Sequence, residues 1–122
     1  MTKESKNILG GKLAACCFDP MTGFFRDGYC HTNKLDHGTH VVCAVVTEEF
    51  LTFSKAQGND LLTPRLEGQF PGLKAGDAWC LCALRWLEAY EHGLAPPIKP
   101  EATSAKVLQL IAREILEKHY IQ

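Results

Sequence analysis

The chain has 122 residues, 46% of them hydrophobic, and its 13 Lys and Arg residues nearly balance 14 Asp and Glu residues, giving a net charge of -1. This length and composition predict one domain over residues 1–122 with its own core and a flexible N-terminal tail at 1–6. Because the charge is balanced in both halves and no apolar run is long enough to cross a bilayer, neither nucleic acid nor a membrane is expected as a partner.

Residues 1–7 are polar and mixed in charge, without the apolar stretch of a signal sequence, which predicts a cytoplasmic protein. The chain carries six cysteines. In a reducing compartment, and with a core that needs no cross-links, free thiols are the expected state. The neighbours Cys16 and Cys17 are also poorly placed to bridge each other. We therefore expect most cysteines to be buried, inert thiols.

The first predicted element is a β-hairpin over residues 22–32. Its turn would be formed by Asp27 and Gly28, a dipeptide that tolerates positive φ at both central turn positions. A polar loop over residues 33–39 then leads to an unbroken apolar, β-branched run. This run predicts a strand over about 40–46 that is covered on both faces and lies at the centre of a short sheet.

A helix is predicted over about residues 48–57. Thr47 can cap its N-terminus, Glu48 and Glu49 lie in its first turn, and Gly58 follows its end. Residues 58–76 contain prolines and glycine-rich turns, which predict a long ordered loop without a regular element. Loops of this length inside compact domains are often functional.

A second helix is predicted over about 78–92, with Asp77 as its cap and Gly93 after its end. Its apolar stripe has a helical period and consists of Trp79, Ala83, Trp86, Leu87 and Tyr90. A third amphipathic helix, whole or broken in two, is predicted over about 104–119. These elements together predict an α+β fold.

The order of several segments along the chain resembles the bacterial DUF2237 family. The segments are 7–11, 22–30, 40–44, the motif Gly58-Asn59-Asp60-Leu61, 70–74, the motif Trp79-Cys80-Leu81-Cys82-Ala83-Leu84-Arg85-Trp86, and 101–103. The resemblance covers nearly the whole chain from about Asn7. It implies a small α+β domain in a bacterial cytoplasm, and it carries no catalytic residue, substrate or cofactor, since the family is named for its unknown function. Polar and cysteine positions within these segments are the candidates for a site: Arg26, Asp27, Cys30, His40, Cys43, Asn59, Asp60, Cys80, Cys82 and Arg85.

A metal site is one candidate, because Cys30, His31, His37, His40 and Cys43 form a cluster along the sequence. Zinc commonly uses pairs of cysteines two residues apart, and this chain has none. If Cys80 and Cys82 lie on a helix, they point about 160° apart and cannot face one ion. We therefore predict no metal ligands, although loop residues Cys30, His31 and His37 leave the possibility open.

A reactive thiol is the second candidate. Cys80 would lie in the first turn of the predicted 78–92 helix, where the positive end of the helix dipole lowers the pKa of a thiol. The neighbouring acid Asp77 and the expected burial beside Leu84 and Leu87 oppose ionisation. Cys80 is therefore either a nucleophile or a packing residue.

The third candidate is a pocket for an anion. Arg26 and Arg85 can donate to a carboxylate or phosphate, Asp27, Asp60 and His40 can supply acceptors or a proton carrier, and Trp79 and Phe70 can form walls. The alternative is that both arginines pair with nearby acids and hold the long loop in place.

We accordingly expect a cytoplasmic protein that binds, or performs simple chemistry on, a small anionic metabolite. The predicted catalytic residues are Cys80, His40 and Asp27, and the predicted ligand-binding residues are Arg26, Asn59, Asp60, Arg85 and Trp79. The rival interpretation is a non-catalytic structural or interaction domain with buried thiols. The sequence indicates no particular cofactor and leaves the oligomeric state open.

Overall fold

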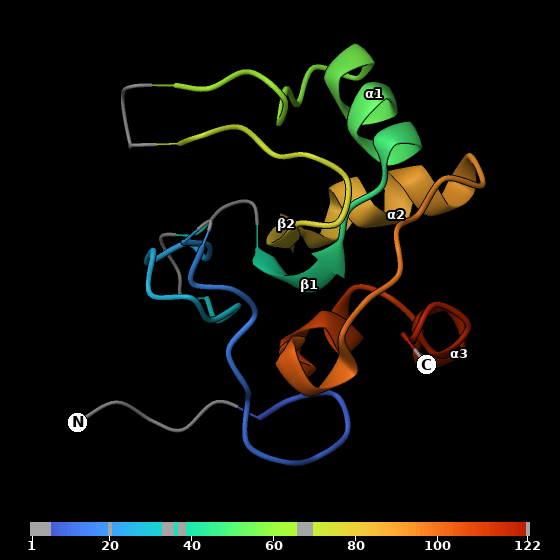
Figure 1. Cartoon of the computed structure of the whole chain (residues 1–122). Helices are drawn as coiled ribbons and strands as arrows, with labels where there is room; N and C mark the ends of the chain where they lie inside the picture. The colour runs from blue at the N-terminus through green and yellow to red at the C-terminus, as the bar shows by residue number, and fades with distance from the viewer. Residues whose placement is uncertain (1–5, 20, 33–35, 37–38, 66–69, 122) are drawn as a thin grey trace.

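The computed structural model describes residues 6–19, 21–32, 36, 39–65 and 70–121 (Figure 1). Its elements are a two-stranded sheet, three α-helices and two 3-10 helices, arranged as an α+β fold, as predicted. None of the helices in the described ranges has the length and apolar character needed to span a membrane. The predicted tail at 1–6 lies outside these ranges except for Lys6, whose carbonyl accepts a hydrogen bond from the Ala105 amide.

The sheet consists of β1 (His40–Val45) and β2 (Ala78–Cys82), which are antiparallel. The predicted strand at 40–46 is confirmed, but it is not central, because the described residues form only this two-stranded sheet. Cross-strand neighbours pair Cys43 with Cys80 and Ala44 with Trp79, with an irregularity between His40 and Val42. Alternation along the strands therefore sends Cys43 and Cys80 to one face of the sheet and Trp79 to the other.

The helix α1 (Glu48–Ala56) confirms the first predicted helix. The Thr47 hydroxyl accepts a hydrogen bond from the Phe50 amide at 3.0 Å, and Glu48 and Glu49 occupy the first turn. These features are the reason the helix begins where the sequence indicates, since they satisfy free amides and complement the helix dipole.

The predicted helix over 78–92 is wrong in its first five residues, which form β2. The helix α2 begins later and spans Ala83–Glu91. The Asp77 carboxylate accepts a hydrogen bond from the Lys74 amide in a turn and caps no helix. The helical stripe was misleading because pairing with β1 overrides local helix preference, and the residues of β2 are themselves apolar enough to be buried in a sheet.

The predicted hairpin at 22–32 is also wrong, since no strand forms among its residues. Here the backbone makes turns, and the backbone of Cys30 pairs with that of Thr103 in an isolated parallel β-bridge. The Thr22 side chain instead accepts a hydrogen bond from the Cys80 amide at 2.8 Å. Partners distant in sequence therefore satisfy polar groups that a hairpin would have paired locally.

The C-terminal segment contains short helices instead of one long helix. These are η2 (Pro100–Ala102), η3 (Ala105–Gln109) and α3 (Arg113–Glu117). The predicted helix at 104–119 is thus broken in two around residues 110–112, one of the two forms that the sequence allowed. Figure 1 shows these segments gathered on the side of the sheet away from α1.

The main core is formed by the sheet, the helices α1 and α2, and residues of the C-terminal segment such as Val107 and Leu116. Trp86 is its largest fully buried side chain, and its indole N–H donates to the Pro96 carbonyl at 3.0 Å. Phe50, Val42 and Leu81 pack in the same cluster. A second, smaller cluster of cysteines and alanines is formed by Cys16, Cys30, Cys43, Ala78, Cys80 and Ala102.

Two disulfides correct the expectation of free thiols. Cys16 bonds to Cys43, and Cys30 bonds to Cys80, while Cys17 and Cys82 are free. Both disulfides are buried in the small cluster and attach the irregular N-terminal segment to the sheet. No local pattern predicts this pairing, because the bonded residues are 27 and 50 positions apart.

Candidate functional site

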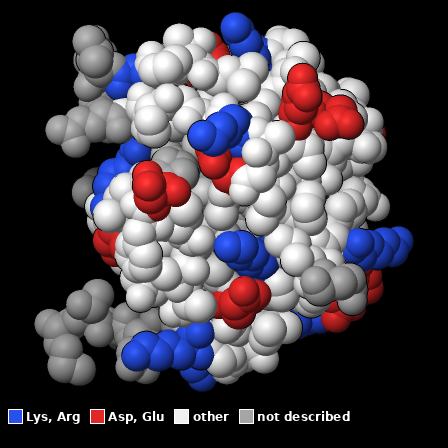
Figure 2. All heavy atoms as spheres, in the orientation of Figure 1, with Lys and Arg blue, Asp and Glu red and all other residues white. Residues whose placement is uncertain are grey.

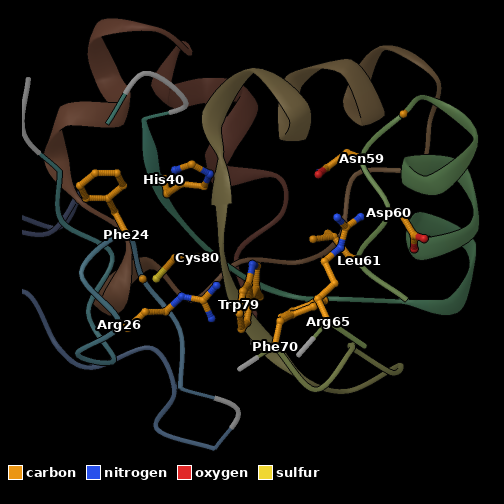
Figure 3. Close-up of a pocket in the computed structure, with 12 residues that line it drawn as sticks. Phe24, Arg26, His40, Asn59, Asp60, Leu61, Arg65, Phe70, Trp79 and Cys80 are labelled. Atoms are coloured by element: carbon orange, nitrogen blue, oxygen red, sulfur yellow. The ribbon is translucent and has the colours of Figure 1, made fainter. Parts of the chain in front are cut away.

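A cavity of about 430 Å³ lies where β2, the loop that follows α1 and the segment after Thr22 meet (Figure 3). It is lined by Gly23, Phe24, Arg26, His40, Gly58, Asn59, Asp60, Leu61, Arg65, Phe70, Trp79 and Cys80. Six of the eight predicted site residues are among them. The structure therefore brings together four separate parts of the sequence that had been selected for their polar or cysteine residues.

Arg26 lies over the face of Trp79, with its guanidinium carbon 5.2 Å from the ring centroid. Trp79 is only 7% exposed and belongs to β2, so it provides a fixed aromatic surface. Arg26 has φ of 55°, a left-handed conformation that is uncommon for a residue with a side chain. Such conformations concentrate at functional sites, where the surrounding structure maintains them.

The Arg26 side chain is exposed, and its hydrogen bond to the Met21 carbonyl is long, at 3.4 Å. Within the described ranges its guanidinium forms no salt bridge. Among the described residues, Arg26 therefore does not pair with an acid to hold the loop, which was the predicted alternative.

A second arginine of the cavity, Arg65, comes from the long loop. Its backbone exchanges two hydrogen bonds with Phe70, at 2.8 and 2.9 Å, which hold its position beside the cavity. The structure records no salt bridge to Arg65 from any residue it describes. In Figure 3, Arg26 and Arg65 approach from the two sides of Trp79.

His40, at the start of β1, is oriented by a buried acid. Its Nδ1 lies 2.6 Å from Asp36 Oδ1, and the Asp36 side chain is fully buried. Burial raises the pKa of Asp36, but hydrogen bonds from the His40 amide, the Thr32 hydroxyl and the His40 ring outweigh it and bring this pKa below its usual value. Asp36 is therefore a stable anion that fixes the His40 ring and favours a proton on Nδ1.

Asn59 and Asp60 form the cavity wall that follows α1. The Ser54 hydroxyl donates to the Asn59 carbonyl at 2.8 Å and ties this wall to the helix. The Asp60 carboxylate accepts hydrogen bonds from the Thr63 hydroxyl, the Leu62 amide and the Thr63 amide. These bonds lower the pKa of Asp60, and the bond from the Thr63 hydroxyl has the largest effect. Asp60 therefore orders the beginning of the long loop.

Cys80 lines the cavity, but not as predicted. It lies in β2 instead of a helix, and its sulfur is bonded to Cys30. The argument for a thiolate at a helix N-terminus is therefore wrong, because both the helix and the free thiol are absent at this position.

Arg85 and Asp27 lie outside the main cavity. Arg85 donates to the Gln57 carbonyl and to Glu88, each at 3.1 Å, beside an adjoining cavity of about 220 Å³. Asp27 Oδ2 lies 2.7 Å from His31 Nε2. Arg85 thus plays the structural role that was weighed against ligand binding. His37, one of the considered loop ligands, lies outside the described residues.

Two cavity residues with distinctive chemistry were not predicted from the sequence. Phe24 precedes Arg26 by two positions and is 38% exposed. Arg65 was treated only as part of a turn. The available signal was that both lie in segments already selected as turns or family-like motifs, but their meeting at one cavity depends on the fold.

Comparison with known proteins agrees with the resemblance seen in the sequence. The model of a family described as an uncharacterized protein conserved in bacteria, DUF2237, matches residues 6–120. No curated protein matches the chain.

Proposed function

The chain belongs to the DUF2237 family, and we propose that it binds a small anionic metabolite in the cavity beside β2. The observation that carries the proposal is the placement of two arginines, Arg26 and Arg65, around an aromatic wall, without a salt bridge to either among the described residues. A ligand carboxylate or phosphate would supply the missing anion, because a guanidinium can donate two parallel hydrogen bonds to such a group.

The size and walls of the cavity support a ligand of metabolite size. A volume of about 430 Å³ lies within the range of roughly 300–1,000 Å³ that is typical of small-molecule sites. Phe24, Phe70 and Trp79 supply apolar surface, and Asn59 supplies an amide. The expected ligand therefore has an anionic group and a planar or apolar part that packs on the aromatic wall.

His40 gives the same cavity a group suited to proton transfer. Asp36 engages Nδ1 and holds the ring, while 39% of the His40 side chain remains exposed at the cavity. This arrangement supports Nε2 as a proton carrier toward a bound ligand. Simple acid–base chemistry on the ligand is therefore part of the proposal, with His40 in that role and Asp36 as its positioning residue.

The second candidate is a structural or interaction domain without a ligand. It is favoured by Arg85, whose Nη1 donates to the Gln57 carbonyl and to Glu88, and by Asp60, whose carboxylate binds its own loop. The surface charge bears on nucleic acid as a partner. Figure 2 shows positive and negative side chains interspersed on the displayed face. This even mixture supports the expectation that nucleic acid is not the partner.

The proposal retains the cytoplasmic location expected from the sequence. Fractionation of cells producing the untagged chain tests it, with recovery in the periplasmic fraction as the contrary result.

Benzoate and benzamide form a matched pair of probes, since they share a ring and differ in charge. We expect benzoate to shift the indole resonance of Trp79 in a two-dimensional NMR titration. The resonance of the buried Trp86 indole should not shift. Replacing Arg26 and Arg65 by Gln should weaken benzoate binding at least about tenfold, which corresponds to about 1.4 kcal/mol. Arg85→Gln is the control and should bind normally. Equal shifts with benzamide, or no shift with benzoate, succinate or phosphate, would favour the structural domain.

A further inference from the structure

The two disulfides lie against each other and form a single sulfur cluster. The sulfur atoms of Cys16, Cys30 and Cys80 all lie within 4.8 Å of one another, and Cys43 is bonded to Cys16. Each of the four cysteines is at most 5% exposed. Two come from the N-terminal segment and two from facing positions of β1 and β2. Four distant parts of the chain thus deliver four sulfurs to one buried place.

We propose that these four cysteines, when reduced, form a zinc site. The structure shows the oxidised state of the cluster, in which the sulfurs are joined in pairs. In the reduced state the same four sulfurs are a complete set of thiolate ligands for one tetrahedral zinc ion, the ligand set of many structural zinc sites.

The geometry requires only small movements. Zinc–thiolate bonds of about 2.3 Å place the sulfurs of a tetrahedral site about 3.8 Å apart. The sulfurs within each disulfide would separate on reduction, and the unbonded sulfurs among Cys16, Cys30 and Cys80, which lie within 4.8 Å of one another, would approach by at most roughly 1 Å. The Cα atoms within each pair, at 5.7 and 5.2 Å, need not move far, since rotations of the cysteine side chains supply these changes.

The surroundings of the cluster select for a soft metal ion. Its neighbours in the small core are alanines and the half-buried Cys17, and no carboxylate or imidazole belongs to the sulfur group among the residues that the structure describes. Magnesium and calcium require oxygen ligands, whereas zinc is bound well by four thiolates. The site would carry a net charge of two minus, and two cations, Arg26 and Arg65, line the cavity that Cys80 also lines.

The chemical steps balance without further components. Two equivalents of a dithiol reduce the two disulfides to four thiols and are themselves oxidised to two disulfides. Binding of one Zn²⁺ then releases four protons as the four Zn–S bonds form. In a reducing compartment, where disulfides seldom persist, zinc would thus replace the two cross-links that hold the N-terminal segment to the sheet.

Cobalt is the probe for this site, because a tetrahedral cobalt–thiolate centre has intense visible and near-ultraviolet absorption. The full chain is reduced with a phosphine, freed of reductant and chelators under anaerobic conditions, and titrated with Co²⁺. We expect one equivalent to produce the tetrahedral thiolate spectrum and one equivalent of Zn²⁺ to bleach it. The oxidised protein should give no such spectrum.

Matched variants locate the ligands. Cys16→Ser and Cys43→Ser should each weaken zinc binding at least about tenfold, whereas Cys17→Ser and Cys82→Ser, which leave the cluster intact, should not. The spectrum of the reduced wild-type protein does not depend on whether any variant folds, so this spectrum is decisive by itself. Absence of the spectrum, a stoichiometry other than one, or its loss in Cys17→Ser or Cys82→Ser would overturn the proposal.

Discussion

Cys43 and Cys80 face each other directly across β1 and β2, yet each forms its disulfide with a different residue of the N-terminal segment. The sheet therefore presents two adjacent anchoring points on one face, and Cys16 and Cys30 attach there. Cys30 follows Arg26 by four residues, so the Cys30–Cys80 bond also joins two walls of the cavity. The position of Arg26 over Trp79 thus depends on a covalent link that is distant in sequence.

The first prediction concerns the cysteines of protein that has been freed of metal with a chelator and oxidised in air. Two thiols, Cys17 and Cys82, should react with iodoacetamide after denaturation, and all six should react after reduction. Intact-mass measurement counts the alkyl groups. Six reactive thiols without reduction would show that the purified protein contains neither disulfide.

Removal of one cross-link should lower stability. The double change Cys16→Ala and Cys43→Ala should reduce the free energy of unfolding by about 2–4 kcal/mol, because the unfolded chain regains the freedom of an open loop. Urea denaturation of the oxidised protein measures this value. Cys17→Ser, which breaks no disulfide, is the control and should stay within about 1 kcal/mol of the wild type.

The Thr22 hydroxyl should contribute to stability, since the side chain is fully buried and its oxygen accepts a hydrogen bond from the Cys80 amide at 2.8 Å. Thr22→Val keeps the shape but leaves a buried amide without a partner, at an expected cost of about 1–3 kcal/mol. Thr22→Ser keeps the acceptor and is the matched control. Hydrogen exchange at the Cys80 amide should accelerate in Thr22→Val and remain slow in Thr22→Ser. Equal exchange in the two variants would contradict the role of the hydroxyl.

Replacing Arg26 by glycine should affect stability and ligand binding in opposite directions. Because its φ is 55°, Arg26→Gly should maintain or raise stability by up to about 1 kcal/mol, while benzoate binding falls at least about tenfold. Thr39 also has positive φ, at 50°, but does not line the cavity, so Thr39→Gly is a control that should not impair binding. Thermal unfolding and NMR titration measure both effects. Unchanged affinity in Arg26→Gly would argue against Arg26 as a ligand.

Asp36 should contribute to stability in a pH-dependent manner. Its pKa in the folded state lies below the usual value of 3.8, so its contribution is complete above that value and is lost as the pH falls through the lower, folded-state pKa. Asp36→Asn should therefore cost about 1–3 kcal/mol at neutral pH. The difference from wild type should shrink below about pH 4.

Urea denaturation across this pH range tests the Asp36 prediction. Asp27→Asn is the comparison, since the Asp27 side chain is 44% exposed, and it should change stability by less than about 1 kcal/mol. A difference for Asp36→Asn that stays constant down to pH 2 would indicate a packing effect instead of a charge effect.

Local signals in the sequence determined where α1 and β1 lie along the chain. Thr47, the two following acids and Gly58 mark both ends of α1, and the β-branched run at 41–46 marks β1. They also directed attention to most residues of the cavity, because Arg26, Asn59, Asp60 and Trp79 stand out by type within turns and motifs. Such signals work because capping and strand propensity act over a few residues.

Only the tertiary structure decided what residues 78–82 become and which partners the cysteines choose. The segment has a helical stripe, yet the backbone of β1 offers it a ladder of hydrogen bonds, and pairing then places Cys80 opposite Cys43. From that register follow the disulfides and the meeting of Arg26, Arg65 and Trp79. These are contacts between residues tens of positions apart, and their free energy exists only when the chain has closed the intervening loops, so no local pattern records it.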